Sequence, residues 1–420
     1  MQIEKADKSD SFYSWLVWFL AAAFFFYKYL LQVSPSVMSD ELMRSFHATG
    51  AQLGNLAACF FYSYLILQIP VGILLDRFNP KYITTAAILI SAIGVYLFSE
   101  AITITDAYIT RGIIGLGAAF AAVSCFKLIT IWFPPKRFAL LAGLSMTAGM
   151  FGAIGGQAPL SILVKNFDWQ IAMKYIAVPG FMLAILFFLL VKERKFQRKD
   201  LNEPRPTLKT QLATVLKCKQ TWILSFYSGL AFAPISVFGG LWGVSFLKQA
   251  YHLSPTAAAS TISFIFVGFA IGCPISGWLS DHLQRRKPLM FIGTSLAIIS
   301  LSVVLYLPQA NATLLSILLL VFGLGASCFF LCFSMVREIN SLMVAATVLG
   351  FMNTFDSVCE ALSEPFIGKM LDFGWDGTLD HGARIFSLRD YHLSLSILVF
   401  YLIGALIFLF FTKETFCRQK

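Results

Sequence analysis

Long apolar stretches separated by short polar segments run through the whole chain. A helix that crosses ~30 Å of hydrocarbon needs about 20 predominantly apolar residues, because each helical residue adds about 1.5 Å. Stretches of that length are expected at 12–37, 51–74, 82–101, 106–131, 138–164, 170–191, 221–247, 257–279, 289–307, 313–336, 343–370 and 392–412. The pattern predicts an all-α polytopic membrane protein with twelve transmembrane helices.

The longest polar interruption, KERKFQRKDLNEPRPTLKTQ, follows the sixth stretch and divides the chain nearly in half. We expect an N-terminal six-helix bundle at 1–191, a basic cytoplasmic linker at 192–220 and a C-terminal six-helix bundle at 221–420. The second stretch ends in GILLDRFNPK and the eighth in GWLSDHLQRRK, so a Gly precedes an Asp by the same spacing in each half. This internal repeat favours two pseudo-symmetric bundles that arose by duplication.

Composition agrees with a membrane protein, because 58% of the residues are hydrophobic and only 13% are charged. A soluble chain carries about 25% charged residues. The net charge of +10 arises from Lys and Arg in alternate connecting segments, which indicates that these segments and both termini are cytoplasmic. The charge is therefore a topology signal, and we expect no nucleic-acid partner.

Short loops favour a bacterial inner membrane, and the eight cysteines are interpreted as small buried apolar residues.

Two motifs resemble those of the major facilitator superfamily. The family loop G-x-L-x-D-R-x-G-R-K is matched at Gly72, Leu74, Asp76, Arg77 and Lys81, with an asparagine at the second glycine position. The fourth stretch opens with RGIIGLG, which is similar to the family pattern R-x-x-x-G-x-G. The resemblance covers essentially the whole chain and implies the family's fold and an alternating-access mechanism.

The resemblance also implies a conformational latch between the halves at the two repeated loops. Physically, the glycines would let helix ends approach closely, the aspartates would accept hydrogen bonds from a neighbouring helix N-terminus, and the basic residues would anchor the loops at the inner surface. The alternative is that the basic residues only anchor these loops on the cytoplasmic side of the membrane. Glu338 is placed to pair with Arg285 or Arg286. The residues expected in the latch are Gly72, Asp76, Arg77, Lys81, Gly277, Asp281, Arg285, Arg286 and Glu338.

Lys28 lies near the middle of the first stretch, where a charge costs roughly 2.5–3.5 kcal/mol. Gln32 is one turn further on the same helical face, and Tyr27 and Tyr29 flank the lysine. We expect Lys28, Gln32 and Tyr27 to contact the solute. The resemblance implies that this helix lines a central cavity. A cation, an amide and phenols in a wet cavity suit a carboxylate or phosphate. An ion pair between Lys28 and a buried acid is the alternative.

The eleventh stretch carries Asn353, Asp356, Glu360 and Glu364 on one helical stripe. A carboxyl group whose protonation depends on which side is open to water is the minimum part of a proton symporter. We expect Asp356 and Glu360 to carry or gate the proton, or to pair with Lys28 in one conformation. A purely structural polar cluster is the alternative.

Three further residues complete the candidate site. The resemblance implies proton coupling for Arg111, at the start of the fourth stretch. Lys127, near the other end of that stretch, is expected either to contact the solute or to reach the inner interface. Trp242 lies in a Pro- and Gly-interrupted seventh stretch that is expected to form a gate and contact the solute, although helix packing also explains it.

These features predict a secondary active transporter that imports a small organic anion together with protons. Sugar acids, di- and tricarboxylates and carboxylate siderophores are all compatible. Alternatives are efflux of drugs or metabolites, uptake of dipeptides or amino acids, and a non-transporting membrane sensor; the fifth stretch has Gly-Gly-Gln-Ala-Pro where drug antiporters of the family have Gly-Pro followed by Gly-Gly.

No nucleotide-binding loop, nucleophile–base pair or metal-ligand set stands out in the sequence. We therefore expect no enzyme activity, no cofactor and no metal. The expected partners are the solute, protons and the lipid bilayer, and the expected state is a monomer.

Overall fold

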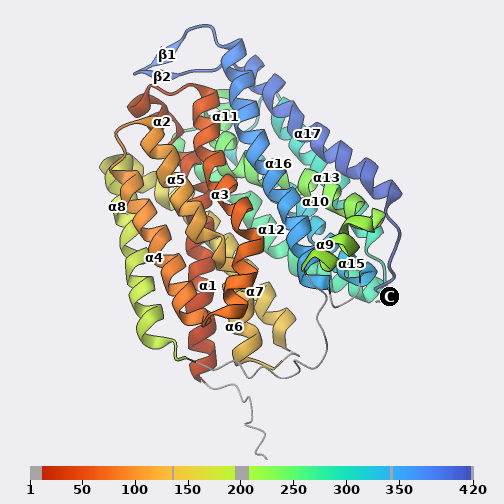
Figure 1. The fold of residues 1–420 in the computed structure, drawn as a ribbon. Helices are drawn as coiled ribbons and strands as arrows, with labels where there is room; N and C mark the ends of the chain where they lie inside the picture. Colours follow the sequence, from red (N-terminus) through yellow and green to blue (C-terminus); the bar gives the residue numbers. More distant parts are fainter. Residues whose placement is uncertain (1–11, 135–136, 194–207, 341–343, 418–420) are drawn as a thin grey trace, which may run out of the picture.

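The computed structural model describes residues 12–134, 137–193, 208–340 and 344–417. Long helices run side by side along the molecule (Figure 1). One end is covered by a short antiparallel hairpin of β1 (Leu379–Asp380) and β2 (Ala383–Arg384). We call this the hairpin end, and we call the opposite end, where α1 begins and α17 ends, the terminal end.

The helices before residue 194 and those after residue 207 correspond to the two halves of the sequence. The first set is α1 (Phe12–Val33), η1 (Ser34–Val37), α2 (Ser39–Phe46), α3 (Gly50–Arg77), α4 (Pro80–Ser99), α5 (Ile104–Ala118), α6 (Phe120–Trp132), α7 (Phe138–Gly155) and α8 (Ala158–Leu190). The second set is α9 (Leu208–Lys217), α10 (Lys219–Val237), the π-helical turn η3 (Phe238–Trp242), α11 (Gly243–Tyr251), α12 (Pro255–Leu283), α13 (Lys287–Tyr306), α14 (Ala312–Ser327), η4 (Cys328–Phe330), α15 (Leu331–Ile339), α16 (Ala345–Gly374) and α17 (Leu388–Phe411).

The described helices make the twelve crossings that the sequence predicts. Ten segments are long and apolar enough to cross a bilayer by length and composition. One of them, Leu140–Leu190, contains two crossings, because the backbone leaves helical geometry at Asp168 (φ 62°, ψ 162°). The remaining crossing is α16, which has 30 residues but carries several charged side chains. The loop expected between residues 164 and 170 is thus a kink within α8.

Three elements were not expected from the sequence. The short helix α2 and the β1–β2 hairpin lie at the hairpin end (Figure 1). The third, α9, falls within the segment expected to be a linker, of which residues 194–207 lie outside the described part of the chain.

Capping side chains fix where several helices begin. Thr49, Thr103 and Ser387 form capping boxes at the starts of α3, α5 and α17, in which the side chain of the N-cap and that of the third helical residue satisfy each other's backbone N–H groups. Asn79 caps α4 with a φ of −66°, so the family's glycine position does not require a positive φ here. These caps place the helix starts at the two ends of the molecule.

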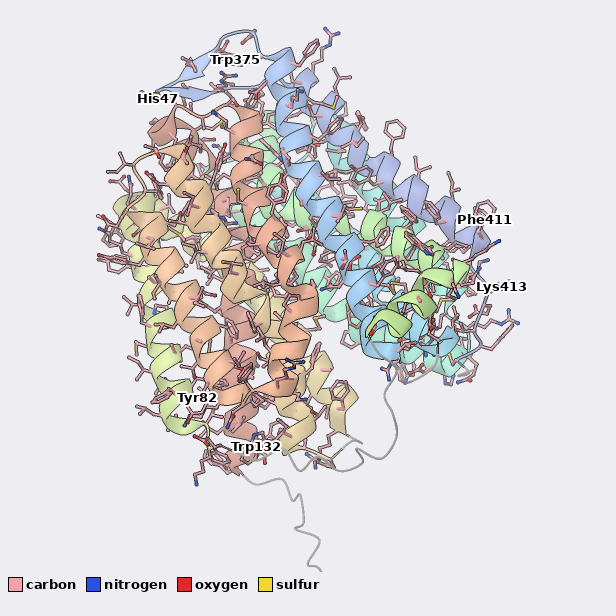
Figure 2. All side chains as sticks on the ribbon, in the orientation of Figure 1. His47, Tyr82, Trp132, Trp375, Phe411 and Lys413 are labelled. Carbon is pink, nitrogen blue, oxygen red and sulfur yellow. The ribbon has the colours of Figure 1, made fainter. Side chains whose placement is uncertain are left out.

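The outer surface has the character of a membrane-facing surface. Large apolar side chains project outward from the middle of the helices, including Ile109, Met182, Ile299 and Phe400. Figure 2 shows Trp375 near the hairpin end, and Tyr82 and Trp132 near the terminal end. Tyr and Trp are enriched at both boundaries of a membrane, so these positions agree with helices that span it.

The two halves touch along α3 and α16 and along α7 and α12. The α3–α16 crossing is very close, because a Cβ atom on Gly54 would lie 2.2 Å from the carbonyl oxygen of Glu364. A Cβ atom on Gly368 would likewise lie 2.1 Å from the carbonyl oxygen of Gly50. Small residues allow such backbone contact between membrane helices. The crossing fixes α16 between the halves near the hairpin end.

We predict that Gly54→Ala destabilises the protein, because its new methyl group would overlap the α16 backbone. Overpacking of this kind costs about 1–3 kcal/mol, which corresponds to a fall in Tm of roughly 1–4 °C for a chain of this length. Thermal unfolding of the detergent-purified variant and wild type measures this fall in Tm. Gly112→Ala is the control, because a Cβ atom there meets nothing within 4 Å. Equal Tm values for Gly54→Ala and the wild type would contradict the close crossing.

Candidate functional site

A cavity of about 550 Å³, including its open mouth, lies between helices of both halves. Its walls come from α1, α3 and α7 of the first half and from α10, α12, η4, α15 and α16 of the second. The lining side chains are Lys28, Tyr29, Gln32, Phe60, Phe61, Tyr64, Met146, Phe232, Phe269, Phe329, Phe330, Phe333, Asn353, Asp356, Ser357 and Glu360.

Lys28 is the cationic group of this cavity. Only 7% of the residue is exposed, and its Nζ donates a hydrogen bond of 2.5 Å to Oε1 of Gln32. Nζ also lies 3.7 Å from the ring centre of Tyr29 and 5.3 Å from that of Tyr64. Among the described residues, no carboxylate lies within 4 Å of it. The ammonium group is thus held by an amide and by aromatic faces.

The carboxyl groups predicted on one stripe of α16 are buried, and two of them reach the cavity. Asp356 accepts a hydrogen bond of 2.6 Å from the hydroxyl of Ser228 on α10. Glu360, one turn further toward the hairpin end, has an oxygen with no hydrogen-bond partner. Glu364, a further turn along, also has an unpartnered oxygen and lies outside the cavity lining. The α3–α16 crossing shields this part of α16 from lipid.

Opposite charges therefore share one space without forming an ion pair. Lys28 and Glu360 line the same cavity from opposite halves and interact electrostatically. Gln32, which accepts from Lys28, donates in turn to the hydroxyl of Ser236 on α10 at 3.2 Å. This chain of hydrogen bonds joins α1 to α10 beside the two charges. It leaves the Lys28 ammonium and the Glu360 carboxyl both able to take another partner.

Arg111 and Trp242 do not line the cavity. Arg111 is 1% exposed, and its Nη1 donates to the carbonyl of Leu31 at 2.9 Å, while Nε and Nη2 have no partner. Trp242 is fully buried in η3, and its indole N–H interacts with the Glu364 carboxyl without meeting the geometric limits of a hydrogen bond. Glu364 interacts electrostatically with Arg111. The proton-coupling role expected for Arg111 would have to act through Glu364 rather than in the cavity.

Two other predicted solute contacts lie outside the cavity. The hydroxyl of Tyr27 points to α8 and donates to the carbonyl of Ile176 at 3.2 Å. Lys127 is half-buried on α6 and is absent from the cavity lining. Tyr29, which neighbours Lys28 on its other side, is the tyrosine that faces the cavity. We therefore exclude Tyr27 and Lys127 from the solute contacts proposed below.

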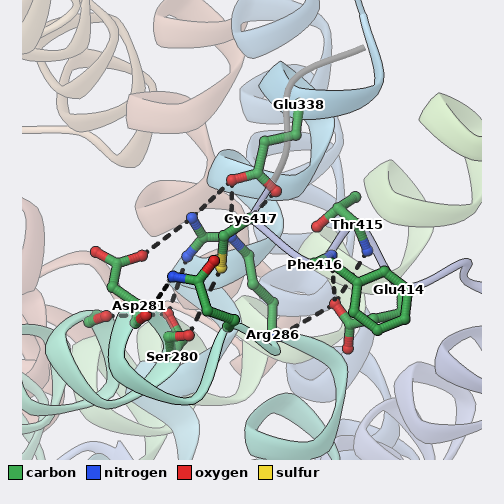
Figure 3. Close-up of polar contacts among 10 residues, drawn as sticks. Ser280, Asp281, Arg286, Glu338, Glu414, Thr415, Phe416 and Cys417 are labelled. Carbon is green, nitrogen blue, oxygen red and sulfur yellow. Dashed lines mark hydrogen bonds and ion pairs between the residues drawn. The ribbon is translucent and has the colours of Figure 1, made fainter.

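At the terminal end of the second half, the repeated loop forms a compact ionic cluster (Figure 3). Arg286 binds Glu338, with nitrogen–oxygen distances of 2.6–3.1 Å, and it lies 3.2 Å from a carboxylate oxygen of Asp281. Its Nη1 also donates to the hydroxyl of Ser280. Burial lowers the pKa of Arg286, but the bonds to Glu338 outweigh this effect and raise it. Glu338 thus pairs with Arg286, while Arg285 is exposed.

Glu414 is part of this cluster and was missed in the sequence. Its carboxylate accepts a hydrogen bond from the backbone N–H of Arg286 at 3.1 Å (Figure 3). It accepts a second from the backbone N–H of Lys287 at 3.0 Å, at the start of α13. A carboxylate at a helix N-terminus satisfies free N–H groups and the helix dipole. No local pattern signals this role, because the partners are backbone groups more than a hundred positions away.

The first-half loop is described only in part. Arg77 is exposed, Lys81 lies over the ring of Phe188 at 5.0 Å, and the side chain of Asp76 is outside the described part of the structure. The expectation that the repeated glycines allow close helix approach is wrong for this conformation. Among the described residues, a Cβ atom on Gly72 or on Gly277 would meet nothing within 4 Å.

The hairpin end is sealed by contacts between the halves that the sequence did not reveal. Asp372 on α16 accepts hydrogen bonds of 2.7 Å from the backbone N–H groups of Gly50 and Ala51, which begin α3. Arg384 of the hairpin bridges to the same carboxylate at 3.0 Å. Lys248 on α11 forms an ion pair with Asp40 on α2. The cavity is therefore closed toward the hairpin.

Comparisons with known proteins agree with this architecture. The family model for the Major Facilitator Superfamily matches residues 15–364. The chain is 24% identical to the uncharacterized transporter YybO of Bacillus subtilis (strain 168) over 65% of this chain and 66% of that protein. It is 28% identical to the hexuronate transporter of the same organism over 46% of this chain and 49% of that protein. The chain thus matches about half to two thirds of these relatives' length.

Among solved structures, the fold is similar to that of a bacterial homologue of the human lysosomal transporter Spinster in an inward-facing, unoccupied conformation. The TM-score is 0.80, with 17% sequence identity and coverage of 96% of this chain and 97% of that one. At this identity the likeness concerns the fold alone.

We predict that Lys28→Met leaves the protein as stable as the wild type or more stable. Removing the ammonium group removes the cost of burying its charge, and Glu360 can avoid an uncompensated charge by taking up a proton, so we expect a Tm equal to that of the wild type or up to a few °C higher. Lys248→Met is the comparison, because that lysine has an ion-pair partner, and we expect no rise in Tm for this variant. Thermal unfolding of both purified variants measures the difference. A fall of several degrees in Lys28→Met would instead identify Lys28 as a structural counterion.

Proposed function

Because this chain belongs to the major facilitator superfamily, we propose that it is a secondary transporter that carries a small organic anion across a membrane together with protons. The observation that carries the proposal is the buried Lys28, which faces the cavity with no carboxylate of the described residues in ion-pair distance, while Glu360 lines the same space. An ammonium group in that setting is ready to bind a solute carboxylate. The name of the hexuronate transporter, a relative, also denotes an organic anion.

Charge balance supplies the reason for proton coupling. In the empty cavity, the charges of Lys28 and Glu360 offset each other through space. An anion bound at Lys28 would take over this role and would leave Glu360 as an extra buried negative charge. Uncompensated charges in a low-dielectric interior cost several kcal/mol, so Glu360 would take up a proton when the anion binds. Solute and proton then move together.

The conformational cycle follows from the contacts at the two ends. We propose that the six-helix bundles at 1–191 and 221–420 rock about the cavity. The contacts of Asp372 and Lys248 would close the hairpin end in one state. The Arg286 cluster, together with Asp76, Arg77 and Asp281, would belong to the latch that closes the terminal end in the other state. Binding at the centre would shift the balance between the two states.

The direction of transport rests on charge distribution. The basic terminal end would face the cytoplasm of a bacterial cell, and the hairpin end would face outward. In a respiring cell the proton gradient points inward across the inner membrane. A carrier coupled to that gradient would then import its solute.

A second candidate is uptake of an amino acid or dipeptide. The specific observation in its favour is that the cavity holds Asp356 and Glu360 as well as Lys28. A zwitterion would place its carboxylate at Lys28 and its ammonium group at the α16 carboxyls. Such a solute would bring no net charge, so its binding would need no proton at Glu360.

Uptake into proteoliposomes tests the proposal, with glucuronate, pyruvate and 3-phenylpropanoate as probes. We expect Lys28→Gln to lower uptake at least about 10-fold, because a charged hydrogen bond is worth roughly 1.5–3 kcal/mol. We expect Glu360→Gln to retain solute exchange but to lose accumulation driven by a proton gradient.

The control for these variants is Glu100→Gln, an acid-to-amide change at an exposed residue paired with Lys174 outside the cavity. It should behave like the wild type. Gradient-driven accumulation by Glu360→Gln at the wild-type level would contradict the coupling role. Wild-type uptake by Lys28→Gln would contradict the anion site.

A further inference from the structure

Five phenylalanines form one continuous wall of the cavity. They are Phe232 of α10, Phe269 of α12, Phe329 and Phe330 of η4, and Phe333 of α15. The rings of Phe232 and Phe329 are stacked with centres 4.9 Å apart, and Phe329 also contacts the other three rings at 5.8–6.1 Å. We call this surface the phenylalanine wall.

The polar groups of the cavity are confined to the other side. Charged and amide side chains come from α1 and α16, and the tyrosine hydroxyls come from α1 and α3. Among the described lining residues, α10, α12, η4 and α15 contribute only phenylalanine. The cavity therefore has a charged side, centred on Lys28 and Glu360, and an apolar side.

This asymmetry discriminates between solute bodies. A hydroxyl group that loses water without gaining a hydrogen-bond partner costs about 1–3 kcal/mol, and a sugar acid carries several such groups. An apolar body gains about 25 cal/mol for each Å² that it removes from water, and aromatic contacts add to this. With its carboxylate at Lys28, a solute would have to lay the rest of its structure along the phenylalanine wall.

Resting on the proposed function, we propose that the transported solute is a carboxylate with an aromatic or branched hydrocarbon body. The carboxylate binds Lys28 and Gln32, and the body packs on the phenylalanine wall. Polyhydroxylated acids of the hexuronate kind are poor solutes of this protein, although a relative is named for them. The wall thus sets specificity, and the charged side sets coupling.

The test compares 3-phenylpropanoate with glucuronate as competing solutes for the full-length protein in proteoliposomes. We expect 3-phenylpropanoate to bind at least about 10-fold more tightly, as hydrophobic pockets discriminate by this order for small apolar groups. Phe330→Ser should weaken the binding of 3-phenylpropanoate several-fold and reduce the difference in affinity between the two solutes. Phe330→Leu, which keeps the wall apolar, is the matched control and should retain the preference.

The outcomes separate this inference from the proposed function. If glucuronate binds as tightly as 3-phenylpropanoate in a Lys28-dependent manner, the inference is overturned and anion transport stands. If neither carboxylate binds, both are overturned. A third outcome is that the amino acid phenylalanine binds more tightly than 3-phenylpropanoate and that Phe330→Ser weakens the binding of phenylalanine. In that case the phenylalanine wall sets specificity as inferred, the solute is a zwitterion, and the proposed anion transport is overturned.

Discussion

A buried ammonium group that contacts no carboxylate of the described part of the chain is the constraint on which the centre of this molecule depends. Lys28 lies in the first crossing, held by Gln32 and by the ring faces of two tyrosines. A hydrogen bond and cation–π contacts offset only part of the cost of removing a charge from water. The rest of the cost is acceptable where a solute anion periodically supplies the missing charge. Under the proposed function, stability is given up at this position for solute binding.

The same reasoning explains why α16 is the least apolar crossing. Its acidic residues would be costly against lipid, but the close α3–α16 contact at Gly54 and Gly368 places them between the halves. This helix connects the cavity to the hairpin end. Glu360 faces the cavity, and Asp372 closes the hairpin end by capping α3. One continuous helix thus connects the cavity to the seal at the hairpin end.

The sequence predicts the crossings well, because length and hydropathy determine them, and the stripe of α16 follows from helical periodicity. It predicts the site less well. Tyr27 was predicted to contact the solute, but Tyr29 faces the cavity, because the rotation of α1 is set by packing against other helices. Glu414 and Asp372 bind backbone groups of distant helices, which leave no pattern in the sequence.

The central claim is that a solute carboxylate replaces Glu360 as the electrostatic partner of Lys28, so that Glu360 takes up a proton. Calorimetric titration in two buffers with different ionisation enthalpies measures the protons taken up per bound solute. The solute is whichever of glucuronate and 3-phenylpropanoate binds more tightly. The account predicts about one proton for the wild type and none for Glu360→Gln. Anion binding to the wild type without proton uptake would contradict it.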